Sequence, residues 1–221
     1  MNDPYVMIPV VGLVIYSITL HELAHAWVAT WCGDPTPGRH GRLTWNPIKQ
    51  LDPIYSVVLP ILTYILNGFP MGFAYCPIQP SYFRKPLRDR ALVAVAGPLT
   101  NVVVSGFFLL MMYIPQITPY DAVKGVPSFN FEVFLQVSRY NLLLAVFNML
   151  PLWPLDGFDV FRVFLPGSLR RQVDQIQNAG FAVMMMVVMV VGGYLMQVIA
   201  PVVMAGYREL LPDRPPFISF Y

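Results

Sequence analysis

Charged side chains are scarce in this chain. Only 12% of its 221 residues are Asp, Glu, Lys or Arg, whereas soluble domains carry about 25%. Hydrophobic residues make up 56% of the chain, and the mean hydropathy is +0.56. This balance argues against a large soluble domain and favours a protein with several membrane-spanning helices. The net charge of only +2 gives no sign of a nucleic-acid partner.

Cysteine is also rare. The two cysteines, Cys32 and Cys76, are too few for a disulfide framework and form no CxxC zinc motif. Both stand at the edges of apolar segments, where we expect them to act as small apolar side chains.

Two of the three histidines stand four residues apart in an apolar helix. The segment Pro4–Leu20 carries no charge and leads directly into His21-Glu22-Leu23-Ala24-His25. Residues four apart lie on one face of an α-helix, so His21 and His25 can both reach one metal ion. Glu22 projects about 100° around the helix, beside the position of a reacting water. This pattern is typical of zinc metalloproteases.

A catalytic zinc ion usually takes a third protein ligand. Two aspartates remain at plausible membrane depth, Asp156 and Asp159, and we favour Asp156 because Pro151 and Pro154 break the helix just before it. The alternative is that Asp156 only caps the next helix. Asp159 is the second candidate ligand, although it could instead pair with Arg162 one turn further on.

The apolar segments predict an all-α polytopic membrane protein with about four to five transmembrane helices. A re-entrant or extended, β-like segment is expected between the first and second long spans, because residues 54–66 are too few to cross and 67–83 alternate Gly, Pro and aromatics. Residues 1–178 are predicted to form the catalytic core, and residues 179–221 a C-terminal transmembrane helix with a short tail. The long helices are expected at 4–31, 91–114, 133–155 and 179–206.

Basic residues predict the orientation. They collect in 33–53, 84–90 and 162–171, and all three regions can be cytoplasmic if 54–83 enters and leaves on one side. The N-terminus would then be external, with the active site toward the cytoplasmic side of a multi-pass protein in the cell membrane. If 54–66 crosses fully instead, one basic loop faces outward.

Four motifs together resemble one protein family. They are the HELAH segment at 21–25, Gly-Arg-Leu-Thr-Trp-Asn-Pro at 41–47, Ala-Gly-Pro-Leu-Thr-Asn at 96–101, and Asn148 followed by Pro154-Leu155-Asp156-Gly157. In order and spacing, over about residues 10–165, they are similar to the site-2 proteases, zinc-dependent intramembrane metalloproteases, in the compact prokaryotic form without an inserted PDZ domain. Trp153 and Phe158 depart from the family pattern beside the aspartate.

The resemblance implies roles for particular residues. His21, His25 and Asp156 would hold one Zn²⁺ ion per chain, and Glu22 would be the catalytic base. Asn148 would bind substrate and the developing oxyanion, and Asn101 would border the active site. From the residues alone, each asparagine could instead make a structural hydrogen bond within or between helices.

The predicted function is therefore hydrolysis of peptide bonds inside the transmembrane segments of membrane-anchored proteins. The expected partners are single-span substrates, the lipid bilayer and a regulatory membrane partner, because no sensing domain is recognised in the sequence. Two alternatives are a zinc-binding transporter and a proteolytically silent membrane adaptor. A transporter has no need of Glu22 beside the histidines, and no broken-helix repeat is visible.

Overall fold

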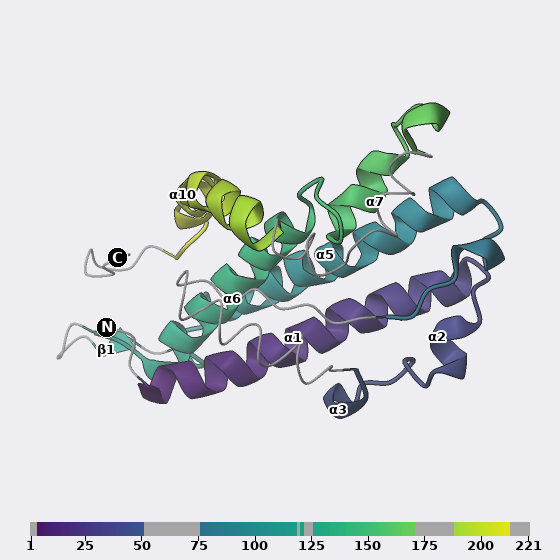
Figure 1. Ribbon diagram of the computed structural model, residues 1–221. Coiled ribbons are helices and arrows are strands. Elements are labelled where there is room, and N and C mark those ends of the chain that lie inside the picture. Colours follow the sequence, from purple (N-terminus) through teal and green to yellow (C-terminus); the bar gives the residue numbers. More distant parts are fainter. Residues whose placement is uncertain (1–3, 51–75, 119, 122–125, 171–187, 213–221) are drawn as a thin grey trace.

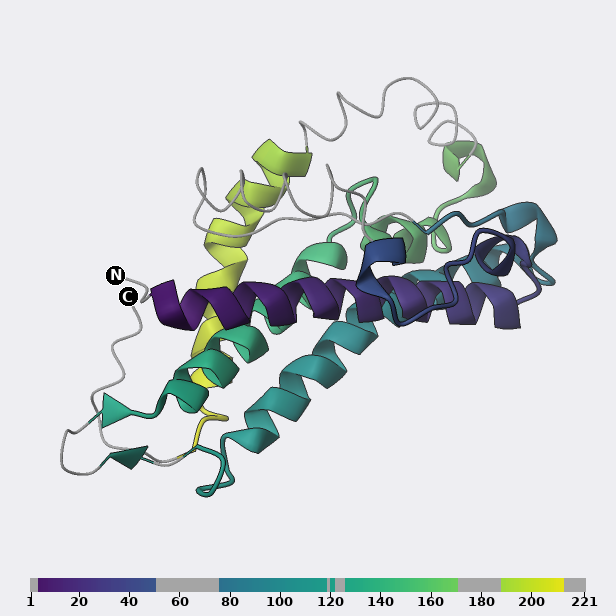
Figure 2. The same cartoon turned by 90° about the horizontal axis from the view of Figure 1, so that it is seen from below.

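Three long helices form the centre of the protein in the computed structural model (Figures 1 and 2). The structure describes residues 4–50, 76–118, 120–121, 126–170 and 188–212. Helices α1 (Pro4–Trp31), α5 (Pro86–Met111) and α6 (Phe129–Asn148) all pack against one another. The C-terminal part of α1 lies beside the N-terminal part of α5, and the short helix α7 (Asp156–Arg162) packs on α5 at this same end.

Helix α1 has the bounds that the sequence predicts. Its N-terminal half buries Val6, Val10, Val14 and Ile18, which recur every four residues and so form one stripe along the helix. The stripe packs against valines and a leucine of α6, and this contact is the apolar core between the two helices.

Helix α5 begins five residues before the predicted start, at Pro86 rather than residue 91. Proline is favoured at a first helical position, and the Asp89 carboxylate accepts a hydrogen bond from the Lys85 backbone N–H at 2.8 Å. Residues 86–90 of the basic cluster are therefore helical. Pro86 and the Asp89 hydrogen bond stabilise the first turn, although the basic residues had favoured a loop.

The helix predicted at 133–155 begins four residues earlier and ends seven residues sooner. Helix α6 ends at Asn148, and α7 begins at Asp156 after a turn that contains Pro151 and Pro154, as the two prolines predict. The N-cap of α7 is Leu155, so the alternative in which Asp156 caps this helix is wrong. Asp156 is instead the first helical residue, and its side chain is free for other contacts.

The remaining elements are short or lie at the periphery. A two-stranded antiparallel pair in the α5–α6 connector is a small departure from an all-α fold, and Figures 1 and 2 show it at the end opposite α7. Of the predicted extended segment, 67–75 lie outside the described residues; 76–79 have no regular structure and lead into a 3₁₀ turn. The remaining bounds are α2 (Thr36–Arg39), α3 (Pro47–Gln50), η2 (Pro80–Tyr82), β1 (Tyr120–Asp121), β2 (Val126–Pro127), the π-helical η3 (Val188–Gly192) and α10 (Gly193–Arg208).

Three helices in the described part of the chain are long and apolar enough to cross a membrane: Pro4–Trp31, Pro86–Met111 and Val190–Arg208. Helix α6 contains Glu132 and Arg139 and is not among them. The predicted total of four to five spans stays a prediction, and the segment 54–66 expected to be re-entrant lies outside the described residues.

Candidate active site

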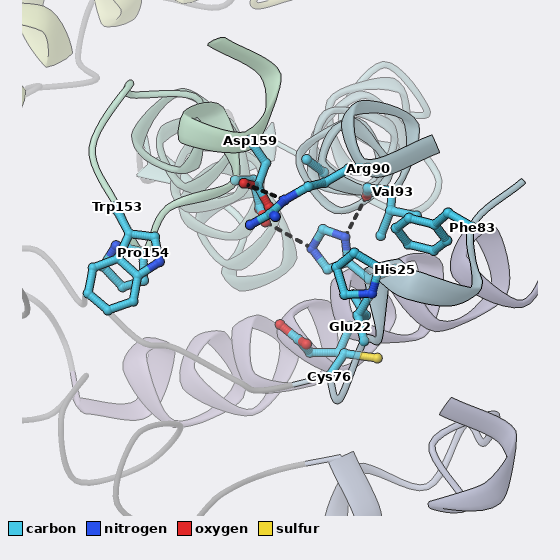
Figure 3. Close-up of a pocket in the computed structure, with 13 residues that line it drawn as sticks. Glu22, His25, Cys76, Phe83, Arg90, Val93, Trp153, Pro154 and Asp159 are labelled. Atoms are coloured by element: carbon cyan, nitrogen blue, oxygen red, sulfur yellow. Dashed lines mark hydrogen bonds and ion pairs between the residues drawn. The ribbon is translucent and has the colours of Figure 1, made fainter. Parts of the chain in front are cut away.

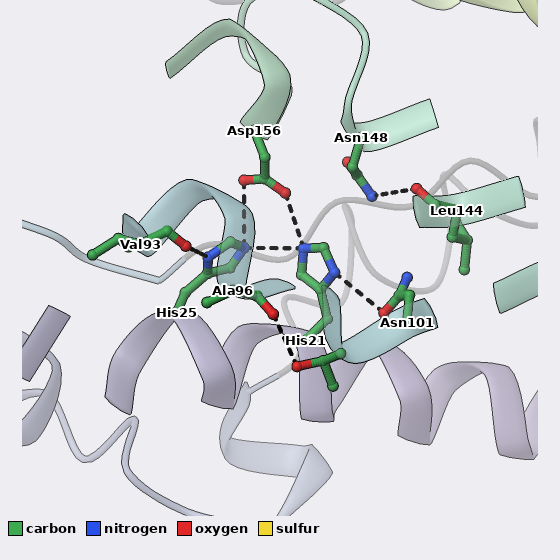
Figure 4. Close-up of polar contacts among 9 residues, drawn as sticks. His21, His25, Val93, Ala96, Asn101, Leu144, Asn148 and Asp156 are labelled. Atoms are coloured by element: carbon green, nitrogen blue, oxygen red, sulfur yellow. Dashed lines mark hydrogen bonds and ion pairs between the residues drawn. The ribbon is translucent and has the colours of Figure 1, made fainter. Parts of the chain in front are cut away.

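The two histidines of α1 point at one place (Figure 4). His21 and His25 are buried, and their Nε2 atoms lie 3.0 Å apart. Their rings meet edge to face at an interplanar angle of 80°. The helical spacing of four residues therefore brings two metal-binding nitrogens to a single point, as the sequence predicts.

The opposite nitrogen of each ring is held by α5. The His25 Nδ1–H donates to the backbone carbonyl of Val93 at 2.7 Å, and the His21 Nδ1–H donates to the side-chain oxygen of Asn101 at 3.3 Å. A carbonyl oxygen can only accept, so the proton of each neutral ring sits on Nδ1. Each Nε2 then presents a lone pair, which is the form that binds a metal ion.

Gly97 of α5 lies directly against these rings. A Cβ atom built on Gly97 would overlap Nε2 of both His21 and His25, so any larger residue would displace them. The glycine belongs to the Ala-Gly-Pro-Leu-Thr-Asn motif, and Asn101 follows it by one helical turn. The motif therefore supplies both the space for the rings and one of their hydrogen-bond partners.

Asp156 joins the histidines from the start of α7. Its Oδ2 lies 3.2 Å from His21 Nε2, and its Oδ1 lies 3.3 Å from His25 Nε2 (Figure 4). The next residue, Gly157, packs so closely on the preceding turn that a Cβ there would overlap the backbone of Met149 and Leu150. This close approach sets where α7 begins, and hence where the Asp156 carboxylate lies.

The donor set fits a zinc ion. Zinc–nitrogen and zinc–oxygen bonds of about 2.0–2.2 Å at tetrahedral angles place neighbouring ligand atoms about 3.4 Å apart. The three separations among His21 Nε2, His25 Nε2 and the Asp156 carboxylate are 3.0, 3.2 and 3.3 Å. With both rings protonated on Nδ1, these atoms carry only lone pairs and negative charge, and a divalent cation held by His21, His25 and Asp156 would supply the attraction between them.

Glu22 lies on the wall of a cavity beside the histidines (Figure 3). The cavity has a volume of about 350 Å³, and His25 and Asp156 also line it. Glu22 is buried, and a carboxylate oxygen of Glu22 lies within 4.8 Å of a ring nitrogen of His21 and of His25. Cys76 lines the same cavity, where burial raises the pKa of its thiol.

Two further predicted residues have other partners. The Asn148 amide donates from Nδ2 to the Leu144 carbonyl of its own helix at 3.1 Å, which is the structural bond that the sequence left open. Asp159, the second candidate ligand, forms an ion pair with Arg90 of α5 at 2.8 Å (Figure 3). It is Asp156 that lies against both imidazoles.

Sequence reasoning missed three contributors on α5, namely Arg90, the Val93 carbonyl and Gly97. For Gly97 a signal existed, because a glycine inside a helix costs about 1 kcal/mol relative to alanine and so often has a packing reason. A backbone carbonyl such as that of Val93 leaves no trace in residue identity.

Buried imidazoles and a carboxylate, with a glutamate in the adjoining cavity and apolar helices around them, are the arrangement expected of a metallopeptidase in a membrane. The model of peptidase family M50 matches residues 122–192, which include Asp156. The similar proteins include two named "Putative zinc metalloprotease": YwhC of Bacillus subtilis (strain 168) and Rip2 of Mycolicibacterium smegmatis. YwhC is 36% identical over 216 residues, covering 94% of this chain and 90% of the relative.

Rip2 is 32% identical over 182 residues, covering 80% of this chain and 65% of the relative. No solved structure matches the chain. The chain belongs to peptidase family M50, the site-2 proteases, and is a zinc metallopeptidase.

Proposed function

We propose that this protein is an intramembrane endopeptidase that hydrolyses peptide bonds within the transmembrane segments of single-span substrates. The observation that carries the proposal is the convergence of Asp156 with His21 and His25, beside Glu22, where the two histidines and Glu22 stand on a helix long and apolar enough to cross a bilayer. The proposed setting is a multi-pass protein of the cell membrane, with its active site toward the cytoplasm.

His21, His25 and Asp156 are proposed to hold one zinc ion per chain. When bound, zinc supplies a Lewis acid that polarises the scissile carbonyl and lowers the pKa of water. Glu22 accepts the proton of the attacking water and then delivers it to the leaving amide nitrogen. Asn101 does not contact this chemistry directly; it positions the His21 ring through Nδ1.

Asn148 is proposed to donate a hydrogen bond to the oxyanion that develops on the scissile carbonyl. Its Nδ2 carries two hydrogens and donates one of them to the Leu144 carbonyl, so the second hydrogen is the one proposed to reach the oxyanion. Oxyanion donors contribute about 3 kcal/mol in other hydrolases.

A substrate helix must also unwind, because its carbonyls are engaged in backbone hydrogen bonds. The segment 76–79 has no regular structure and borders the cavity through Cys76 and Ile78. The Asp34 carboxylate secures its end by accepting the Gln79 N–H at 2.7 Å and the Thr36 N–H at 2.9 Å. We propose that the unwound substrate adds along this segment as an extended strand.

The test is reconstitution in lipid vesicles with a panel of single-span substrate helices. Glu22→Gln should keep zinc bound and lower cleavage by at least about a hundredfold, because it removes only the proton acceptor. Asp156→Ala should lose zinc, whereas Asp159→Ala, on the same helix, should weaken zinc binding far less because Asp159 pairs with Arg90 and does not lie against the imidazoles.

Three results would overturn the proposal. Zinc flux across vesicles without cleavage would favour a transporter. Intact cleavage in Glu22→Gln would remove the proposed base. Zinc binding that survives in Asp156→Ala but is lost in Asp159→Ala would transfer the third ligand to Asp159.

A further inference from the structure

Helix α7 is short for an element that must hold a metal ligand. It has seven residues, and no side chain caps its first turn. Isolated helices of this length are not stable, so the orientation of α7 depends on what packs against it. Gly157 fixes the point where α7 begins, but a second contact is needed to fix the direction in which α7 runs.

The second contact is the ion pair between Asp159 and Arg90. Asp159 follows Asp156 by one helical turn, and its Oδ1 lies 2.8 Å from Nε of Arg90 on α5 (Figure 3). Both side chains are largely removed from solvent, at 23% exposure for Arg90 and 29% for Asp159. The pair lines the same cavity as Glu22 and Asp156.

Arg90 also belongs to the helix that supports the histidines. Val93 lies one turn further along α5 and holds His25, and Gly97 lies against both rings. We propose that Arg90 and Asp159 are a positioning pair: they hold α7 on α5 so that Asp156 meets the two imidazoles. This inference rests on the proposed ligand set of His21, His25 and Asp156.

The physical basis is the free-energy cost of leaving one charge unpaired where both side chains are largely removed from solvent. Removing one partner of a shielded ion pair leaves the other charge without compensation, and that charge moves toward water or toward a new partner. Such a movement would carry the first turn of α7, and Asp156 with it, away from the histidines. Residues that orient metal ligands typically change metal affinity by about 10–100-fold when mutated.

A purely electrostatic role makes a different prediction. Arg90 is positive and Asp159 is negative, so through-space effects on a bound cation have opposite signs. Neutralising Arg90 would then tighten zinc binding, and neutralising Asp159 would weaken it. A positioning pair predicts that either change weakens zinc binding.

The experiment measures zinc affinity by competition with a chromogenic chelator, using the full chain in detergent micelles or nanodiscs. Arg90→Gln and Asp159→Asn should each weaken zinc binding by about tenfold. The double variant should bind zinc no more weakly than either single variant, because the two residues act as a unit. Arg88→Gln is the matched control, since Arg88 pairs with Asp89 within α5 itself.

Opposite shifts in the two single variants would overturn the inference, and so would a lower unfolding midpoint of the zinc-free protein with no change in zinc affinity. Asp156→Ala is measured alongside as a reference for the ligand set. If Asp156→Ala binds zinc like the wild type, the proposed ligand set fails. If Asp156→Ala loses zinc while both neutralised variants keep it, only the positioning role fails.

Discussion

The N-terminal half of α1 buries valines, whereas its C-terminal half buries His21, Glu22 and His25. The first half packs against α6 through apolar contacts, which are not directional. The second half is held by α5 through contacts at particular atoms. The Val93 carbonyl and the Asn101 side-chain oxygen each accept a hydrogen bond from one histidine ring, and both rings lie against Gly97. One helix thus serves two neighbours, so changes that damage the fold and changes that damage the site should be separable.

The largest expected effect is at Gly97. In Gly97→Ala the new Cβ would overlap Nε2 of both histidines, and the rings must move apart. We expect zinc affinity to fall by about a hundredfold, with a parallel loss of proteolysis, measured by chelator competition and by cleavage of a single-span substrate. Gly106→Ala on the same helix has no atom within 4 Å of its Cβ and should bind zinc normally. Normal zinc binding in Gly97→Ala would show that α5 does not confine the rings.

A smaller effect is expected at Asn101. Asn101→Ala removes the acceptor that fixes the His21 ring, so zinc affinity should fall by about tenfold. Thr100→Ala is the control, because the Thr100 hydroxyl bonds only to the Ala96 carbonyl of its own helix among the described contacts. Equal zinc affinities in the two variants would mean that the His21 ring needs no partner at Nδ1.

How much the sequence could predict follows the same division. Helix α1, the histidine pair and the break before Asp156 were all predictable, because a charge-free run, a spacing of four and two prolines are local signals. The start of α5 was predicted five residues late. The basic residues at 84–90 favoured a loop, but the Asp89 carboxylate accepts a hydrogen bond from the Lys85 N–H and stabilises the first turn of the helix there. The pairing of Asp159 with Arg90 joins residues far apart in the chain, and no local pattern encodes it.

The apolar half of α1 should respond in the opposite way. Val10 is 1% exposed in the contact with α6, and Val10→Ala leaves a small void there. We expect a loss of about 1–2 kcal/mol in the free energy of unfolding in mixed micelles, with zinc affinity of the folded protein unchanged. Val11→Ala is the matched control, because Val11 is 46% exposed. A fall in zinc affinity in Val10→Ala would show that the two halves of α1 are coupled.

The smallest expected effect locates the boundary between the halves. Ser17 lies one turn before His21 and accepts a hydrogen bond from Asn141 Nδ2 of α6 at 3.1 Å. Side-chain hydrogen bonds between membrane helices average about 0.6 kcal/mol, and Ser17→Ala should cost no more than this in unfolding free energy. Because Ser17 bonds to α6 and not to α5, zinc affinity should not change. A weaker zinc site in Ser17→Ala would mean that α6 also supports the histidines, and the division of labour between α5 and α6 would then begin one turn earlier.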